Sequence, residues 1–111
     1  MGPPSNLTVD ESRMDGSVRL SLTGKLDVAT TPALEARLTG FRARKSPVRL
    51  DLSNLDFIDS TGIHMLIRMV GDARIKHWQL RIEPAVAPQV RSVFRLVHLD
   101  HFLEGGERPT S

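Results

Sequence analysis

The chain opens with a pattern of apolar and polar residues that predicts a β-hairpin. Apolar residues alternate with polar ones over positions 7–9 and again over 18–22, which is the period of a strand that buries one face. Between these segments lies Asp15-Gly16, a dipeptide suited to the positive backbone angles of a tight hairpin turn. We therefore expect two antiparallel strands at the start of the chain.

Helical spacing follows this hairpin. Leu34, Leu38 and Phe41 recur at i, i+4 and i+7, and Thr30-Thr31-Pro32 precedes them. That tripeptide offers a capping hydroxyl and a proline for the first helical position. The pattern predicts a helix of about three turns that ends near residues 42–45.

The strand and helix patterns then recur twice. Alternation over 48–53 predicts a strand with one buried and one polar face, and a short apolar turn leads to a helix that begins at Asp59-Ser60-Thr61-Gly62. A third segment gives a strand around 78–82 and a helix with apolar residues at 90, 93, 94 and 97. The buried stripe of the helix after Gly62 is predicted to be Ile63, Leu66, Ile67 and Val70.

These elements predict an α/β fold in one domain. Strand-helix-strand units pair their strands in parallel, whereas the opening hairpin is antiparallel, so we expect a mixed sheet of four or five strands. Because its strands have one polar face, helices should pack mainly on the other face. We expect the domain to span residues 7–104, with a flexible N-terminus over 1–6 and a flexible C-terminal tail over 105–111.

Composition narrows the class of protein. With 40% hydrophobic and 25% charged residues, the 111-residue chain is typical of a single soluble globular domain. It has no cysteine and no apolar run long enough for a membrane span, so the cytoplasm is the expected compartment. The basic stretch Arg37 to Arg49 carries no nucleic-acid motif, and a solvated helix end is favoured there over a phosphate-binding patch.

Metal and cofactor sites are not expected. His98, Asp100 and His101 could be mistaken for metal ligands, but they fall at a predicted helix end, where histidine suits the helix dipole. Glycine-rich phosphate loops are absent from the sequence, so nothing predicts that this chain binds a nucleotide.

Ser60 is the strongest candidate for a functional residue, and the sequence is compatible with three roles for it. Asp59 or Ser60 could cap the helix. Ser60 could be a nucleophile with His64 four residues later, although the first glycine of the G-x-S-x-G elbow is missing. Finally, Ser60 could accept a phosphoryl group, which the free N–H groups of a helix N-terminus would favour. A phosphate beside Asp56 and Asp59 would repel a partner docked there.

The sequence resembles the STAS domains of anti-sigma-factor antagonists. The resemblance rests on Gly24-Lys25-Leu26-Asp27, Leu50-Asp51-Leu52-Ser53 and Phe57-Ile58-Asp59-Ser60-Thr61-Gly62-Ile63, with Val90-Arg91-Ser92-Val93-Phe94 and Leu99-Asp100-His101-Phe102 near the end. These segments occur in the family's order across residues 7–104. Lys25, Thr61 and His64 depart from the residues that many members have at these positions.

The resemblance implies a regulatory protein and not an enzyme. In this family the unphosphorylated antagonist binds an anti-sigma factor that is also a serine kinase, which releases the sigma factor until the kinase phosphorylates the antagonist. The matching phosphorylation site is Ser60, with Thr61 as the less favoured acceptor, and a serine phosphatase is a further candidate partner. The expected partner-binding residues are Asp27, Asp59, Ser60, Thr61, Gly62, His64, Met65, Arg68 and Met69.

Alternatives remain at this point. Asp27 could instead be a loop residue that caps the following helix, and Met65 and Met69 could either form an apolar strip for a partner or pack against a neighbouring helix. A STAS module that senses a small ligand, or that works within a larger signalling complex, would need Ser60 only as a cap. A hydrolase or phosphotransfer enzyme using Ser60 and His64 is a rival from another class.

Overall fold

The computed structural model describes residues 6–97, which form one mixed sheet and three helices. The strands are β1 (Leu7–Met14), β2 (Ser17–Leu26), β3 (Val48–Ile58) and β4 (Leu80–Ile82). The helices are α1 (Thr31–Ala43), α2 (Ser60–Ile75) and α3 (Pro88–Leu96). This confirms the predicted element order and sets the sheet at four strands.

The strand order in the sheet is β1-β2-β3-β4. β1 pairs with β2 in antiparallel fashion, whereas β2 with β3 and β3 with β4 are parallel. Asp15 and Gly16 have φ values of 51° and 81° at the β1–β2 turn, as the sequence predicts for this dipeptide. A mixed sheet follows directly from one hairpin and two helical crossovers.

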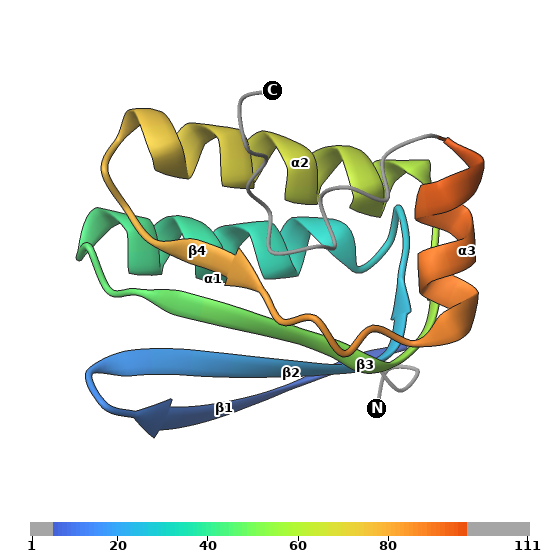
Figure 1. Cartoon of the computed structure of the whole chain (residues 1–111), viewed down its shortest axis with the longest axis horizontal. Helices are drawn as coiled ribbons and strands as arrows, with labels where there is room; N and C mark the ends of the chain where they lie inside the picture. Colours follow the sequence, from blue (N-terminus) through green and yellow to red (C-terminus); the bar gives the residue numbers. More distant parts are fainter. Residues whose placement is uncertain (1–5, 98–111) are drawn as a thin grey trace.

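One face of the sheet carries the core. Inward residues of β2 and β3 such as Leu20, Leu22, Leu50 and Leu52 are fully buried. The long helices α1 and α2 lie side by side over this face, and α3 lies across the end of the sheet where β3 finishes (Figure 1). Helices therefore cover mainly one face, as predicted, and the other face of the sheet is polar.

The segment before α2 differs from the prediction. We expected a short apolar turn after residue 53, but β3 continues to Ile58 because Leu55, Phe57 and Ile58 pair with the last residues of β2. The strand therefore delivers the chain directly to the start of α2. Consequently, the N-termini of α1 and α2 lie at the same end of the molecule (Figure 1).

Several expectations concern residues outside the described range. The proposed tails at 1–6 and 105–111, and the group His98, Asp100 and His101, fall there entirely or almost entirely, so they stay predictions. Within residues 6–97, no helix is both long enough and apolar enough to cross a membrane.

Candidate functional site

Asp59 caps the N-terminus of α2. Its Oδ1 accepts a hydrogen bond of 3.0 Å from the backbone N–H of Gly62. This bond satisfies one of the N–H groups that a helix leaves free in its first turn. Of the two residues that the sequence offered as caps, Asp59 therefore has this role, and Ser60 occupies the first helical position.

The second carboxylate oxygen of Asp59 holds the loop that follows β2. Oδ2 accepts a hydrogen bond of 3.1 Å from the backbone N–H of Val28, and the backbone N–H of Asp59 donates to the carbonyl of Leu26 at 3.2 Å. One side chain thus connects the loop before α1 to the start of α2. The loop between β2 and α1 and the first turn of α2 therefore form one continuous surface.

Asp27 shapes this loop from within. Its Oδ1 accepts hydrogen bonds from the N–H groups of Ala29 and Thr30 at 3.0 and 3.2 Å. The Thr30 hydroxyl accepts from the N–H of Asp27 and donates to the carbonyl of Lys25. The prediction that a threonine hydroxyl caps α1 is therefore wrong for Thr30, because loop contacts already use it.

Ser60 is exposed, and its hydroxyl makes no hydrogen bond to the part of the chain that the structure describes. Thr61 beside it is also exposed. A hydroxyl in this position is accessible to another protein, and the first turn of a helix favours an added negative charge. The site therefore fits a phosphoryl acceptor better than a cap.

Exposed residues continue along α2. Ser60, His64 and Arg68 are four residues apart, so they share one helix face. Arg68 donates a 2.7 Å hydrogen bond to Glu35 of α1, and this bond lowers the pKa of the Glu35 carboxyl. We call Val28, Ser60, Thr61, His64 and Arg68 the Ser60 surface.

Apolar groups lie at the same end of the molecule. Val28 is 68% exposed and Phe57 is 45% exposed, at the carboxyl ends of β2 and β3. Neither residue was among the predicted partner contacts. For Val28 a signal was present, since an apolar residue follows Asp27 between the second predicted strand and the first predicted helix. Phe57 was interpreted as part of an apolar turn.

Three predicted contact residues are buried and cannot meet a partner directly. Met65 and Met69 are each 1% exposed, because α2 packs against both the sheet and α1. Gly62 is buried where α2 approaches β2, and a Cβ there would come within 2.9 Å of the carbonyl oxygen of Leu26. These residues therefore belong to the core on which α2 packs, and they are not part of the exposed surface around Ser60.

Replacing Asp59 tests the cap. We expect Asp59→Ala to lower the free energy of unfolding by about 1 to 2 kcal/mol, because it removes the acceptor for Gly62 and the link to Val28. Asp59→Asn keeps one oxygen that can cap, so its loss should be smaller. Urea unfolding of the two variants measures the difference, and equal losses would contradict a capping role.

The chain matches a known family over most of its length. The family model described as "Mlab, STAS domain" matches residues 9–104. The anti-sigma-B factor antagonist of Bacillus subtilis (strain 168) is 24% identical over 62 residues, or 56% of this chain and 57% of that protein. The protein of the same description from Staphylococcus aureus (strain NCTC 8325 / PS 47) is 32% identical over 63 residues, 56% of this chain and 58% of its own length. The matched stretch thus spans a little over half the length of these curated relatives.

Solved structures have the same architecture. The crystal structure of an anti-sigma factor antagonist from Mycobacterium paratuberculosis aligns with a TM-score of 0.71 and 25% identity, covering 91% of this chain and 86% of that one. Unphosphorylated SpoIIAA, also an anti-sigma factor antagonist, aligns with a TM-score of 0.70 over 85% of this chain and 84% of its own. Its identity of 18% supports the fold alone.

Proposed function

This chain belongs to the STAS domain family, and we propose that it is an anti-sigma factor antagonist switched by phosphorylation of Ser60. The unphosphorylated form binds an anti-sigma factor with serine kinase activity and frees a sigma factor. Phosphorylation by that kinase ends the interaction, and a serine phosphatase restores it. The protein thus has a regulatory and not an enzymatic role, and it acts in the cytoplasm with the sigma factor.

One observation carries this proposal. The Ser60 hydroxyl is exposed and without a partner in the described residues, although Asp59 beside it is fully engaged in hydrogen bonds. The local structure thus holds the helix start in place without using the serine. The similarity to curated antagonists supports the same role.

The Ser60 surface has the chemistry of a docking site. The exposed Val28 supplies apolar area, while the exposed His64 and Arg68 of α2 supply polar groups. Interfaces combine an apolar centre with a polar rim in this way. Asp27 and Asp59 contribute by shaping the loop and helix start, so their effect on the partner is indirect.

Capture from a lysate of the native cell tests the proposal. Unphosphorylated wild type should retain an ATP-binding serine kinase, whereas Ser60→Asp should lose it. Ser92→Asp makes the same change at an exposed serine of α3 and should bind like wild type. With ATP added, mass spectrometry should find phosphate on Ser60, and Ser60→Ala should remain unmodified. Capture of the same kinase by wild type and Ser60→Asp would overturn the switch.

A further inference from the structure

The open face of the sheet carries a row of three arginines. Arg19 of β2 pairs with Arg49 of β3, and Arg49 pairs with Arg81 of β4. Directly paired residues of neighbouring strands point to the same face. Three arginine side chains therefore project from neighbouring positions across the sheet, on the face that α1 and α2 leave uncovered.

Arg19 is the only one of the three that is neutralised. It donates hydrogen bonds of 3.0 and 3.1 Å to both oxygens of Glu83, and one of 3.0 Å to Asp51. Burial alone would raise the pKa of Asp51, but hydrogen bonds from Ser53 and Ser21 and the charge of Arg19 lower it below the ordinary value. Two carboxylates thus serve a single guanidinium.

Arg49 and Arg81 have no such partner. Both are exposed, and neither makes a hydrogen bond or ion pair within residues 6–97. Like charges that face each other across paired strands destabilise a sheet. This arrangement has no evident role in the stability of the fold, and an anion bound between the two side chains would relieve the repulsion.

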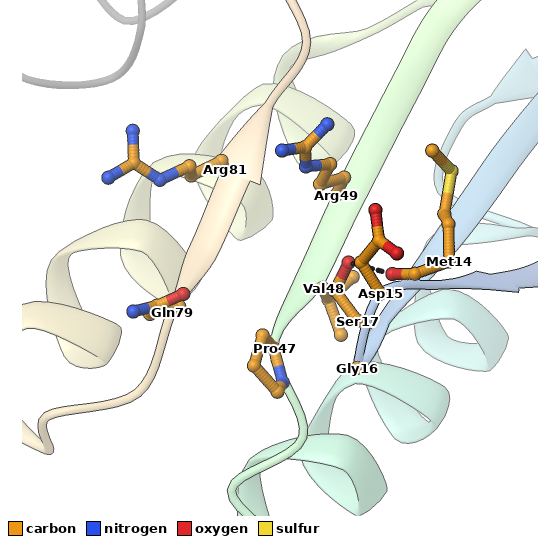
Figure 2. A pocket seen from close by; sticks show the side chains of 9 residues that line it. All are labelled: Met14, Asp15, Gly16, Ser17, Pro47, Val48, Arg49, Gln79 and Arg81. Atoms are coloured by element: carbon orange, nitrogen blue, oxygen red, sulfur yellow. Dashed lines mark hydrogen bonds between the residues drawn. The ribbon is translucent and has the colours of Figure 1, made fainter.

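The two arginines also border hollows in the surface. One hollow of about 230 Å³ lies between the β1–β2 turn and the starts of β3 and β4 (Figure 2). Figure 2 shows Arg49 and Arg81 on neighbouring strands, with Gln79 just before β4 and Asp15 at the turn. A second hollow of about 490 Å³ is bordered by the same two arginines and by residues 82–85.

We propose that Arg49 and Arg81 bind the phosphate group of a small, soluble phosphate monoester. The planar guanidinium donates paired hydrogen bonds that match phosphate oxygens. A phosphate monoester carries a charge of about −1.5 to −2 at neutral pH, close to that of two arginines, whereas one carboxylate carries only half of it. The adjoining hollows give room for the organic part of the molecule.

This site is separate from the proposed switch. Arg49 and Arg81 lie near the start of β3, whereas Ser60 follows its other end. The basic stretch from Arg37 to Arg49 was interpreted above as a solvated helix end, and Arg49 departs from that interpretation because it belongs to β3 and pairs with Arg81. Failure of one proposal therefore leaves the other standing.

Nuclear magnetic resonance of the isotope-labelled full chain tests the site. We would titrate it with inorganic phosphate and with glycerol 3-phosphate, using sodium chloride to keep the ionic strength constant. Saturable shifts are expected at Arg49, Arg81 and Gln79. Arg49→Ala and Arg81→Ala should each weaken binding roughly tenfold or more, the loss expected from one charge-assisted hydrogen bond.

Two further variants separate a site from general charge attraction. Asp15→Asn removes a negative charge from the edge of the smaller hollow and should strengthen binding. Arg95→Ala removes an exposed arginine from α3 and should leave binding unchanged. Shifts that do not saturate, an equal loss with Arg95→Ala, or binding only to sedimented vesicles containing phosphatidic acid would each overturn the proposal.

Discussion

Phosphorylation of Ser60 is expected to weaken the binding of the anti-sigma factor by roughly thirty- to several-thousand-fold. Nearly two negative charges would enter the Ser60 surface beside Asp59, whose carboxylate already holds the backbone of the exposed Val28. A partner that covers this position would have to bury the phosphate together with the neighbouring carboxylate of Asp59. A penalty of about 2 to 5 kcal/mol corresponds to this range.

The fold itself should tolerate the phosphate. Ser60 is at the first helical position, where free N–H groups and the helix dipole favour an anion, so the melting temperature should not fall. Isothermal titration calorimetry with the purified anti-sigma factor measures the affinity of the phosphorylated protein, of Ser60→Asp and of Ser60→Ala. Ser60→Ala should bind like wild type, and Ser92→Asp is the matched control. Unchanged affinity after phosphorylation would refute the mechanism.

Replacing Gly24 with alanine is expected to cost roughly 2 to 5 kcal/mol of unfolding free energy. Gly24 has a φ of +107°, and a Cβ there would lie 2.1 Å from the carbonyl oxygen of Asn6. That oxygen accepts a hydrogen bond of 2.8 Å from the N–H of Lys25, so it cannot move away without losing the contact. The irregular pairing of β2 with β3 at Gly24 and Lys25 depends on this conformation.

Gly16 provides the matched comparison. Its φ of +81° is also positive, but a Cβ there would meet no atom within 4 Å. Gly16→Ala should therefore carry only the backbone penalty, about 1 to 2 kcal/mol. Urea unfolding of both variants separates the cost of the positive φ from the cost of the steric clash with Asn6. If the two losses were equal, the close approach of Asn6 would have no energetic effect.

Local patterns in the sequence were enough to predict the architecture. Alternation placed β1, β2 and β3, and helical spacing placed all three helices, because each element buries one face. The turn at Asp15-Gly16 followed from backbone preference alone. The family resemblance that rested on the segments around Gly24 and Ser60 is confirmed by the match over residues 9–104.

The burial of residues on a helix that packs against two other elements could not be predicted in the same way. A single stripe on α2 leaves Met65 and Met69 outside it, but the helix packs on both the sheet and α1, and its buried face is therefore wider. Ile67 was predicted to be buried, but it lies at the edge of this buried face and is only half-buried. Helical periodicity describes the helix alone and carries no information about a second neighbour.

The burial of a charged side chain also could not be predicted from the sequence. Asp51 alternates with apolar residues and so was assigned to an exposed polar face, but it is only 4% exposed. Arg19 and Ser21 come from another strand and Ser53 from the same one, and together they surround it with hydrogen bonds. These partners are up to 32 positions away in sequence, and only the sheet register brings them together.

The two-sided bond of Asp59 has a consequence for the speed of recognition. Because one carboxylate secures both the helix start and the neighbouring loop, the surface around Ser60 is ordered before any partner arrives. Association then needs no slow rearrangement on this side, and the entropic cost of ordering is met during folding. In the proposed switch, the lifetime of each regulatory state is therefore set by the rates at which phosphate is added to Ser60 and removed from it, and not by a conformational change of the protein.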